Sequence, residues 1–374
     1  MARKSKKIVI LYASAGHGHE KAARAVDAVC RTNPSWDVKL VDVLDLTAMG
    51  FGKHYRALYF FLIKKFPGVW GFFYGLTDLS WVYFFVKPLR RINNRFFANK
   101  LETFLKNEAP DVVISTHFLG SEATSHLKKT GRIKSSLITV ITDYMPHAFW
   151  IDSHTDAYAV ATSMTKESMK RRGVVEEKIF ITGIPIESKF YAQLDKQQAM
   201  ESLGLKSSLF TVLITSGGAG VGIADDLVKR LSIVEPRIQQ LVVCGTNKLL
   251  FEDLRERFGQ SSSIRLYGFV ENINELMAAS DVVVGKGGGL TITECLCVGR
   301  PMVLFGAVPG QETRNVEQAV KYGAAKAAKS INQAVQFVLN FRQNKQMTND
   351  ALAAIENLRQ EGSAHKIVKL AMEL

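Results

Sequence analysis

Short apolar runs alternate with longer stretches of mixed polarity along most of this 374-residue chain. Five runs in the first half are rich in Val and Ile and predict strands: KKIVILYAS, DVKLVDV, PDVVISTH, SLITVITD and the shorter YAVA. The second half repeats the pattern with FTVLITSGG, QQLVVCGT, IRLYGFV, SDVVVGKGGG and RPMVLFG. Because stretches with helical periodicity separate these runs, the alternation predicts parallel βαβ units and an α/β fold.

A break in this pattern falls in the middle of the chain. Over residues 183–208, Gly, Pro and polar residues interrupt both periodicities, which marks a domain junction. One hydrophobic core seldom serves a chain this long. We therefore predict an N-terminal domain over residues 1–185 and a C-terminal domain over residues 186–348. Residues 349–374 are predicted to form a C-terminal helix that packs back on the N-terminal domain.

Composition and cysteine spacing exclude several classes of protein. A hydrophobic content of 47% with 22% charged residues is typical of a folded globular chain. The four cysteines form no CxxC pair and no metal-finger spacing, which favours reduced, buried thiols in a cytosolic protein. The apolar run after the basic N-terminus leads straight into Gly and His, so it indicates a strand and not a signal peptide. No stretch approaches the roughly 18 apolar residues of a membrane span.

The positive charge is concentrated in the first half of the chain. The formal net charge is +13, and residues 1–185 hold 27 Lys and Arg against 16 Asp and Glu. Residues 51–97 also hold 16 of the 36 aromatic residues, with eight Lys or Arg against one acid, Asp78. Aromatic rings and cations on a short amphipathic segment suit the surface of an anionic bilayer. The alternative is an aromatic core beneath a basic surface.

Three turns carry a high density of glycine directly after predicted strands. They are Gly16-His17-Gly18-His19, the segment TSGGAGVG that ends at Gly222, and GKGGGLTITE over residues 285–294. Glycine lets main-chain N–H groups approach a ligand closely, and a helix that begins there attracts an anion such as phosphate. Two such turns in the second half favour a nucleotide diphosphate as the ligand, although glycine also serves simple packing in α/β turns.

Polar residues follow the last glycine turn. Glu294 is predicted to lie in the first turn of the next helix, where its carboxylate could accept bonds from two adjacent sugar hydroxyls. The alternative is a carboxylate that only complements the helix dipole. Further along, Gln311, Glu312 and Asn315 cluster at a helix start. This cluster suits a polyhydroxylated ligand and is equally compatible with helix caps.

Together these motifs resemble those of the diacylglycerol glycosyltransferases of glycosyltransferase family 28, which include processive glucosyltransferases and monogalactosyldiacylglycerol synthases. The resemblance covers nearly the whole chain. It rests on the Gly/His turn, TDYMPHAFW, GIPI, SGGAGVG, GFVENINELMAASDVVVGKGGGLTITE and PGQETRN. It implies the GT-B fold, with two Rossmann-like doubly wound domains facing a central cleft. The N-terminal domain would then bind the acceptor, and the C-terminal domain would bind a UDP-sugar donor.

The resemblance also implies roles for residues of the second half. Glycines of two turns would lie near the diphosphate: Gly217, Gly218, Gly288 and Gly289. The main chain of Phe269 and Val270 would meet uracil, and Glu294 would hold the ribose. The remaining members of the predicted donor site are Gln311 and Glu312, which would contact the transferred sugar, together with Thr291 and Asn315.

Two histidines flank Gly18 where the first strand gives way to a helix. By the resemblance, His19 falls on the family's histidine, and His17 stands where relatives carry glycine. Imidazole titrates near neutral pH and a helix N-terminus lowers its pKa, so we predict that neutral His19 is the general base of an inverting displacement. For His17 a structural or capping role is favoured. Neither HExxH nor an acidic DxD signature occurs, so no metal or other cofactor is predicted.

The motif TDYMPHAFW adds Asp143, His147 and Trp150, which with Gly18 are predicted to line the acceptor side of the cleft. A diacylglycerol acceptor is reached only from the membrane plane, which favours membrane docking by the aromatic, basic segment. The residues predicted to dock are Tyr59, Phe60, Lys64, Lys65, Trp70, Arg90 and Arg91. We expect a peripheral, monotopic protein at the cytoplasmic face of a bacterial cell membrane. Its expected partners are diacylglycerol, anionic lipids and a UDP-sugar, and not nucleic acid.

The predicted reaction moves a hexose, glucose in preference to galactose, from the UDP-sugar to the free hydroxyl of diacylglycerol and gives a β-linked glycolipid. Two alternatives stay open: a UDP-GlcNAc transferase acting on a lipid-linked peptidoglycan precursor, and a non-catalytic UDP-sugar sensor at the membrane. A dinucleotide-dependent dehydrogenase fails because Lys21 takes the third glycine position of its fingerprint. The number of sugars added, the oligomeric state and regulation are left open.

Overall fold

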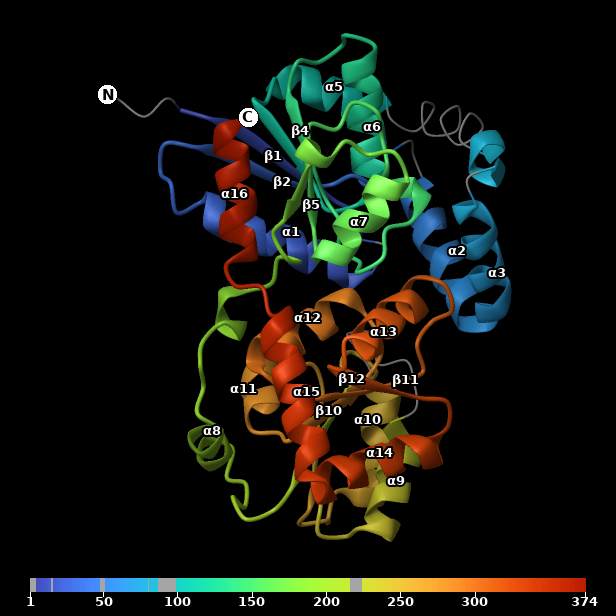
Figure 1. The fold of residues 1–374 in the computed structure, drawn as a ribbon, viewed down its shortest axis with the longest axis vertical. Coiled ribbons are helices and arrows are strands. Elements are labelled where there is room, and N and C mark those ends of the chain that lie inside the picture. Colours follow the sequence, from blue (N-terminus) through green and yellow to red (C-terminus); the bar gives the residue numbers. More distant parts are fainter. Residues whose placement is uncertain (1–4, 15, 48–50, 80, 87–98, 216–223) are drawn as a thin grey trace. The chain divides into compact units, whose positions relative to one another are not determined.

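A computed structural model describes residues 5–14, 16–47, 51–79, 81–86, 99–215 and 224–374. The chain divides into two compact units. Unit 1 comprises Met1–Glu187, Pro309–Gln311 and Gln360–Leu374, and unit 2 comprises Ser188–Val308 and Glu312–Arg359. Each unit is built around its own parallel sheet (Figure 1). Unit 1 is thus assembled from three separate segments of the chain.

The sheet of unit 1 has six parallel strands in the order β2-β1-β3-β4-β5-β6. Their bounds are β1 Lys7–Tyr12, β2 Asp37–Asp42, β3 Val112–Ser115, β4 Ser136–Val140, β5 Ala157–Val160 and β6 Ile179–Ile181. The strand order reverses between β1 and β3. At such a point the loops after the two strands lead away from each other, and open α/β sheets bind ligands there.

Helices cover both faces of this sheet. Their bounds are α1 His17–Cys30, α5 Asn99–Glu108, α6 Phe118–Lys129, α7 Ser163–Arg171 and α16 Ser363–Glu373. Alternate residues of β1 point to opposite faces, so Ile8 and Ile10 pack with α1 and α16, whereas Val9 and Leu11 pack with α5 and α6. A parallel strand that is buried on both faces is apolar at nearly every position. This burial explains the unbroken IVIL run in the sequence.

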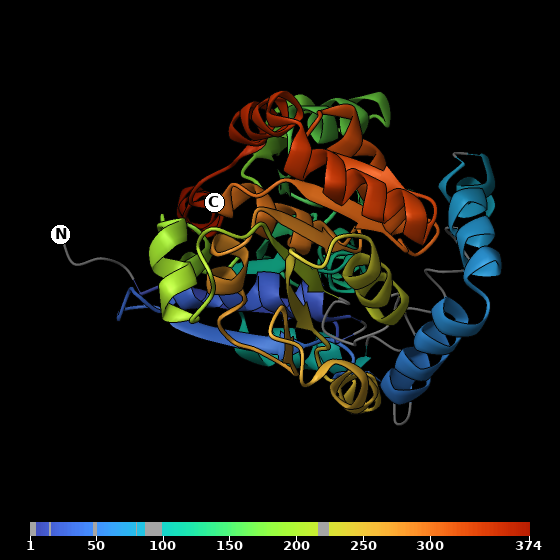
Figure 2. The ribbon, with the colours of Figure 1, turned by 90° about the horizontal axis from the view of Figure 1, so that it is seen from below.

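Two further helices of unit 1, α2 (Phe51–Lys65) and α3 (Pro67–Asp78), form a hairpin. Pro67 begins α3, where its missing N–H is tolerated, and it prevents α2 from continuing. Figures 1 and 2 show the pair at the margin of unit 1, outside the helices that cover the sheet. Several of its apolar side chains face solvent. Within the described ranges, every helix falls short of the length and hydropathy of a membrane span.

The sheet of unit 2 also has six parallel strands, in the order β12-β11-β10-β7-β8-β9. Their bounds are β7 Thr211–Thr215, β8 Gln239–Val243, β9 Ile264–Tyr267, β10 Val282–Gly285, β11 Met302–Phe305 and β12 Ala325–Ala328. This is the strand order of the Rossmann fold, and it reverses between β7 and β10. The helices are α8 Lys196–Ser202, α9 Ala224–Val234, α10 Lys248–Phe258, α11 Ile273–Ala278, α12 Gly289–Val298, α13 Gln311–Lys321, α14 Ile331–Gln343 and α15 Lys345–Leu358.

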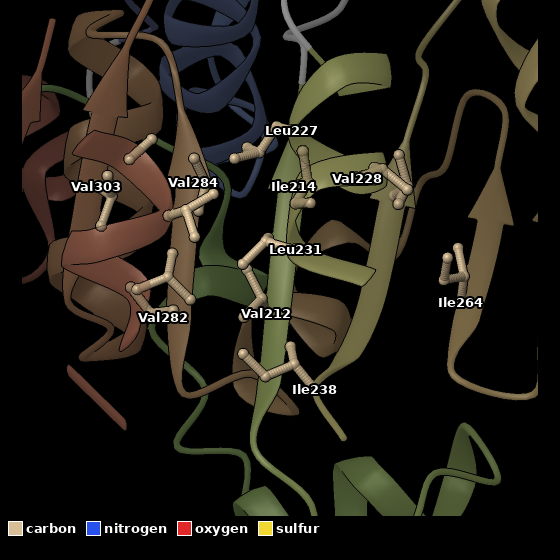
Figure 3. Close-up of a cluster of buried hydrophobic side chains, with 14 of the residues drawn as sticks. Val212, Ile214, Leu227, Val228, Leu231, Ile238, Ile264, Val282, Val284 and Val303 are labelled. Carbon is tan, nitrogen blue, oxygen red and sulfur yellow. The ribbon is translucent and has the colours of Figure 1, made fainter. Parts of the chain in front are cut away.

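The largest buried cluster of unit 2 lies between the sheet and the helices α9 and α14. Figure 3 shows Val212 and Ile214 of β7 beside Val282 and Val284 of β10, with Leu231 of α9 packed on them. Burying such a side chain contributes about 1.5–3 kcal/mol. The cluster therefore holds β7 and β10 firmly, and the two glycine-rich segments start from the carboxyl ends of these strands.

The predicted fold class of two doubly wound α/β domains is confirmed, and all ten predicted strands are present. The sequence does not predict β6 or β12. The strand β12 reads AKAA, and alanine favours helices over strands, but pairing of its main chain with β11 fixes it at the sheet edge. The strand β6 has three residues, too few for a periodicity.

The C-terminal stretch differs from the predicted single helix over residues 349–374. Two helices are present, α15 ending at Leu358 and α16 beginning after its N-cap Gly362, whose φ of 64° lies in the left-handed region that interrupts a helix. The helix α15 belongs to unit 2, and the last segment of unit 1 begins at Gln360. The helix α16 packs on α1, and its Ile367 and Val368 lie in the core of unit 1.

Candidate active site

His19 lies where the strand order of unit 1 reverses. It is the third residue of α1, which begins directly after the loop that follows β1. Gly16 precedes the helix with a φ of 137°, a conformation that favours glycine. The Nδ1 atom of His19 lies 2.8 Å from the carbonyl oxygen of Thr116, just after β3, and 3.0 Å from Oγ1 of Thr142, just after β4. Three neighbouring strand ends therefore position this ring.

These contacts determine the tautomer of His19. A carbonyl oxygen only accepts hydrogen bonds, so Nδ1 carries the proton and donates it to Thr116, and Nε2 keeps its lone pair. Burial lowers the pKa of His19 to about 4, although the bond to Thr116 raises it. The ring is therefore neutral at physiological pH. The cause of the shift is burial, whereas the sequence predicts an effect of the helix N-terminus.

The His19 ring borders a pocket in unit 1, which we name the aromatic pocket. Its lining residues are His19, Tyr59, Trp70, Tyr74, His117, Phe118, Asp143, His147, Phe149, Trp150 and Gln311. Aromatic rings contact one another edge to face here, as with His19 and His117, whose centroids are 4.6 Å apart. A wider hollow of unit 1 lies at the amino-terminal ends of the strands and contains none of the predicted site residues.

Asp143 and Gln311 are joined by hydrogen bonds at the aromatic pocket. The Nε2 atom of Gln311 lies 2.8 and 3.0 Å from the two carboxylate oxygens of Asp143, which is only 2% exposed. The neighbouring Gly310 has a φ of 99°, and a Cβ there would lie 2.9 Å from the ring of Tyr74. The segment Pro309–Gln311 thus belongs to unit 1 through contacts with distant parts of the sequence.

His147 and Trp150 lie in the turn η1 (Ala148–Trp150) and the residue before it. His147 Nδ1 accepts the main-chain N–H of Phe149 at 3.1 Å, so its Nε2 carries the proton and donates to the carbonyl of Tyr74 at 2.9 Å. Trp150 is buried, with its ring centroid 6.1 Å from that of His19. His147 therefore joins η1 to α3, whereas Trp150 packs beside the His19 ring.

In unit 2, the glycine turn after β10 leads into α12. Gly288 is the N-cap and has no side chain, so it makes no side-chain cap bond to the first N–H groups of the helix. Thr291 lies in the first turn. Glu294 is buried at 6% exposure and lies in the second turn of α12, not in the first turn as predicted. Its carboxylate therefore does not act as a first-turn partner of the helix dipole.

A lysine that the sequence analysis does not single out lies beside this turn. Lys286 directly follows β10, and burial lowers the pKa of its half-buried ammonium group, although nearby Glu312 raises it. Glu312 lies in the first turn of α13 and accepts the main-chain N–H of Val308 at 2.7 Å. Asn315, one turn later, is buried. A cation and several polar groups thus gather at the carboxyl ends of β10 and β11.

Two family models match the chain. One is described as monogalactosyldiacylglycerol (MGDG) synthase and covers residues 19–186, and the other as glycosyltransferase family 28 C-terminal domain and covers residues 211–336. A "processive diacylglycerol beta-glucosyltransferase" of Bacillus cereus (strain G9842) is 32% identical over 332 residues, which is 86% of this chain and 82% of the relative. The chain belongs to the diacylglycerol glycosyltransferases of family 28.

Two more comparisons extend this result. A relative of the same name from Staphylococcus carnosus (strain TM300) is 28% identical to this glycosyltransferase, over 100% of the chain and 94% of the relative. Among solved structures, Acinetobacter baumannii MurG superimposes with a TM-score of 0.63 at 15% identity and covers 99% of this chain. At that identity the likeness concerns the fold alone, and it is the GT-B fold that the motifs predict.

The structure of this glycosyltransferase brings part of the predicted acceptor set together. His19, Asp143, His147 and Trp150 all line the aromatic pocket. Gly18 precedes His19 in α1 but is not a lining residue. The exposed His17 is not a lining residue either. Sequence reasoning missed His117, whose Nδ1 accepts the N–H of Leu119 and caps α6, although the strand-end motif PDVVISTH was a signal for it.

The predicted donor and docking residues differ in their exposure to solvent. Phe269, just after β9, is 59% exposed, and Val270 is partly exposed. Phe60 and Lys65 are exposed, whereas Tyr59 and Trp70, also predicted to dock on the membrane, line the aromatic pocket. Helical spacing alone does not tell which face of α2 or α3 turns inward. Gly217, Gly218, Arg90 and Arg91 and the side chain of Lys64 lie outside what the structure describes.

Proposed function

We propose that this glycosyltransferase transfers glucose from UDP-glucose to the free hydroxyl of diacylglycerol and inverts the configuration of the anomeric carbon. The names of its relatives in Bacillus and Staphylococcus support both the acceptor and the β-glucosyl product. The proposal depends above all on one observation: the unprotonated Nε2 of His19 at the wall of a pocket lined with aromatic rings. A base beside an apolar wall suits an acceptor that carries one hydroxyl on a lipid.

In the proposed reaction the acceptor hydroxyl donates its proton to His19 Nε2 while its oxygen attacks C1 of the sugar. A new C–O bond forms, the bond from C1 to the diphosphate breaks on the opposite face, and UDP leaves with the electron pair. The Thr116 carbonyl stabilises the resulting imidazolium through Nδ1–H, as the third member of a catalytic triad does. Because a base with a pKa near 4 is weak, the proton transfer would accompany C–O bond formation rather than precede it.

On the donor side, we propose that the diphosphate binds the N-terminus of α12 at Gly288 and Gly289, with the ammonium group of Lys286 neutralising part of its charge. Buried Glu294 is the proposed ribose partner, and Glu312 a partner of the sugar hydroxyls. Gln311 stays a proposed sugar contact, although it would exchange its bond to Asp143 for that role. No metal ion is needed in this scheme, so activity is expected to survive EDTA.

We further propose that the enzyme binds the cytoplasmic surface of the membrane through α2 and α3. Phe61, Phe72 and Phe73 are more than half exposed there, beside the exposed Lys65. Such side chains enter the boundary between headgroups and acyl chains, and cations add attraction to anionic lipids. Replacement of Lys64, Lys65, Arg90 and Arg91 with Glu is expected to release the protein from anionic vesicles in a sedimentation assay. Undiminished binding of that variant would contradict docking by charge.

The test of the base is His19→Ala, assayed with diacylglycerol vesicles and UDP-glucose. Glycolipid formation is expected to be lost, while UDP binding measured by calorimetry is unchanged. His17→Ala is the matched control, because this neighbouring imidazole is exposed and outside the aromatic pocket. Asp143 is the second candidate base in the same pocket. If His19→Ala kept activity within a few-fold of wild type and Asp143→Asn lost it, the base would be the carboxylate.

The donor sugar and the acceptor are tested in the same assay. UDP-glucose is expected to be used in preference to UDP-galactose and UDP-GlcNAc, and the product with diacylglycerol is expected to be β-linked by NMR. Transfer only from UDP-GlcNAc to a lipid-linked peptidoglycan precursor would replace the proposal with its main alternative. UDP binding without any transfer would favour the non-catalytic sensor.

A further inference from the structure

Asp78, the last residue of α3, is bound to two other parts of unit 1. The guanidinium of Arg172, just after α7, donates from Nη1 and Nη2 to the two carboxylate oxygens of Asp78, both at 2.8 Å. Oδ1 also accepts the main-chain N–H of Ala148 in η1, at 2.7 Å. The Asp78 side chain is 8% exposed and that of Arg172 25%. This bidentate, shielded pair is of the strong kind, unlike an exposed surface ion pair.

The electrostatics agree with a paired carboxylate. Burial raises the pKa of the Asp78 carboxyl, but the paired Arg172 guanidinium and the N–H of Ala148 hold it below its usual value. One turn earlier in α3, the carbonyl of Tyr74 accepts the bond from His147 Nε2 at 2.9 Å. The C-terminal half of α3 is therefore attached to η1 at two successive turns, and to the end of α7.

The two faces of α3 differ in what they contact. Trp70 and Tyr74, four residues apart on one face, line the aromatic pocket together with His19. Val69, Phe72 and Phe73 on the other face are 47%, 65% and 55% exposed. One helix thus supplies a wall of the candidate site and an apolar surface of unit 1.

We propose that Asp78 is a positioning residue for the lipid acceptor. Its ion pair with Arg172 holds α3 so that Trp70 and Tyr74 form a wall of the aromatic pocket. This inference rests on the proposed function. The acyl chains of the acceptor would contact the outer face of α3, and its glycerol hydroxyl would pass the inner face to His19.

Loss of the Asp78 charge is expected to shift α3 without unfolding the rest of unit 1. The hairpin lies at the margin of unit 1, outside the helices that cover the sheet (Figure 2). Loss of the Asp78 charge would leave the guanidinium of Arg172 partly buried without its carboxylate, an unfavourable state that is relieved when α3 shifts away. The sheet and its core would stay folded, because none of the residues of α3 belongs to the main buried clusters of unit 1.

The experiment compares wild type, Asp78→Asn and Arg172→Met in the full-length enzyme. We expect kcat/KM for diacylglycerol in vesicles to fall about tenfold or more in each variant. The KM for UDP-glucose is expected to stay within about twofold, and vesicle binding to be unchanged because the outer face of α3 is intact. Glu176→Gln is the control, since it removes an exposed ion pair with Lys170 on the neighbouring helix α7.

A double-mutant cycle separates positioning from a general loss of stability. If Asp78 acts through the wall of the pocket, Trp70→Ala and Asp78→Asn together cost little more than either alone. Additive losses, or an unchanged kcat/KM for diacylglycerol in Asp78→Asn, would overturn the inference. So would a parallel loss of vesicle binding, because Asp78 would then serve membrane attachment and not the acceptor site.

Hydrogen exchange distinguishes failure of this inference from failure of the proposed function. Amides of α3 are expected to exchange faster in Asp78→Asn than in wild type, while those of α1 and α6 keep their protection. This measurement needs no substrate. A wild-type enzyme that made no glycolipid would refute the proposed function. Unchanged exchange of the α3 amides in Asp78→Asn would instead show that the ion pair with Arg172 does not hold α3 in place.

Discussion

Acid is expected to destabilise unit 1 in a way that depends on His19. Burial lowers the pKa of this ring to about 4 in the folded protein, whereas a histidine in an unfolded chain has a pKa of about 6.5. Between these two values the unfolded chain binds a proton that the folded protein does not. The stability that depends on neutral His19 is therefore fully present above pH 6.5 and is lost progressively as the pH falls toward 4.

The size of the effect follows from the width of this window. At pH 5 the unfolded histidine is almost fully protonated and the folded one is not, which amounts to about 2 kcal/mol of lost unfolding free energy. At pH 4 and below the loss approaches about 3 kcal/mol. The residue His19 as a whole is only partly shielded from solvent, which screens part of this cost, so about 1–2 kcal/mol at pH 5 is the expected result.

The assay is urea unfolding followed by tryptophan fluorescence at pH 8 and pH 5, for wild type and His19→Asn. All four tryptophans of the chain lie in the first 150 residues, so the signal reports on unit 1. Asparagine lacks the titrating ring, and subtraction of the two proteins removes the contribution of every other acid and base. The reasoning is wrong if the stability difference between wild type and variant is the same at both pH values within about 0.3 kcal/mol. In that case His19 is not buried as described, and burial is not what keeps its ring neutral.

Three further predictions concern other parts of the molecule. Gly183→Ala is expected to destabilise unit 1 by about 2 kcal/mol in the same assay, because φ is 81° and a Cβ would meet Gln360 at 2.6 Å beside α16; Gly173→Ala, with φ 83° and open space, measures the backbone strain alone. Lys286→Met is expected to weaken binding of UDP about tenfold in calorimetry but not binding of uridine, whereas the exposed Lys321→Met changes neither; equal weakening for both ligands would place Lys286 away from the diphosphate. All four cysteines are buried, and burial raises the pKa of Cys30 to about 12, so the native enzyme is expected to resist a thiol reagent at pH 8 that labels four thiols in urea.

The main-chain architecture was largely accessible from the sequence, because a parallel strand buried on both faces leaves an unbroken apolar run. The run around Ile8–Leu11 is such a case, and so is the run of β10. The strand β12 was not accessible, since its alanines carry no strand preference and pairing with β11 alone determines its conformation. A local sequence pattern predicts an element correctly only where contacts with the rest of the fold do not override the intrinsic preference of its residues.

The candidate site shows the same limit. The Gly/His turn predicted His19 at a strand end, because strand-to-helix turns of α/β sheets hold ligands at a known edge. The partner of Asp143 could not be predicted, since Gln311 follows it by 168 residues and only the folded chain brings the two side chains together. The inward direction of Tyr59 and Trp70 was hidden for a related reason: an aromatic residue at helical spacing suits a lipid surface and a pocket wall equally well.

The discontinuous composition of unit 1 has a consequence for biosynthesis. Its last piece, α16, follows all of unit 2 along the chain and places Ile367, Val368 and Leu370 in the core, a contribution on the order of 6 kcal/mol. That is comparable with the whole stability of a typical domain. Most of unit 1 therefore leaves the ribosome before unit 2 but stays incompletely covered until α16 has been made, so unit 2 is able to complete its fold earlier.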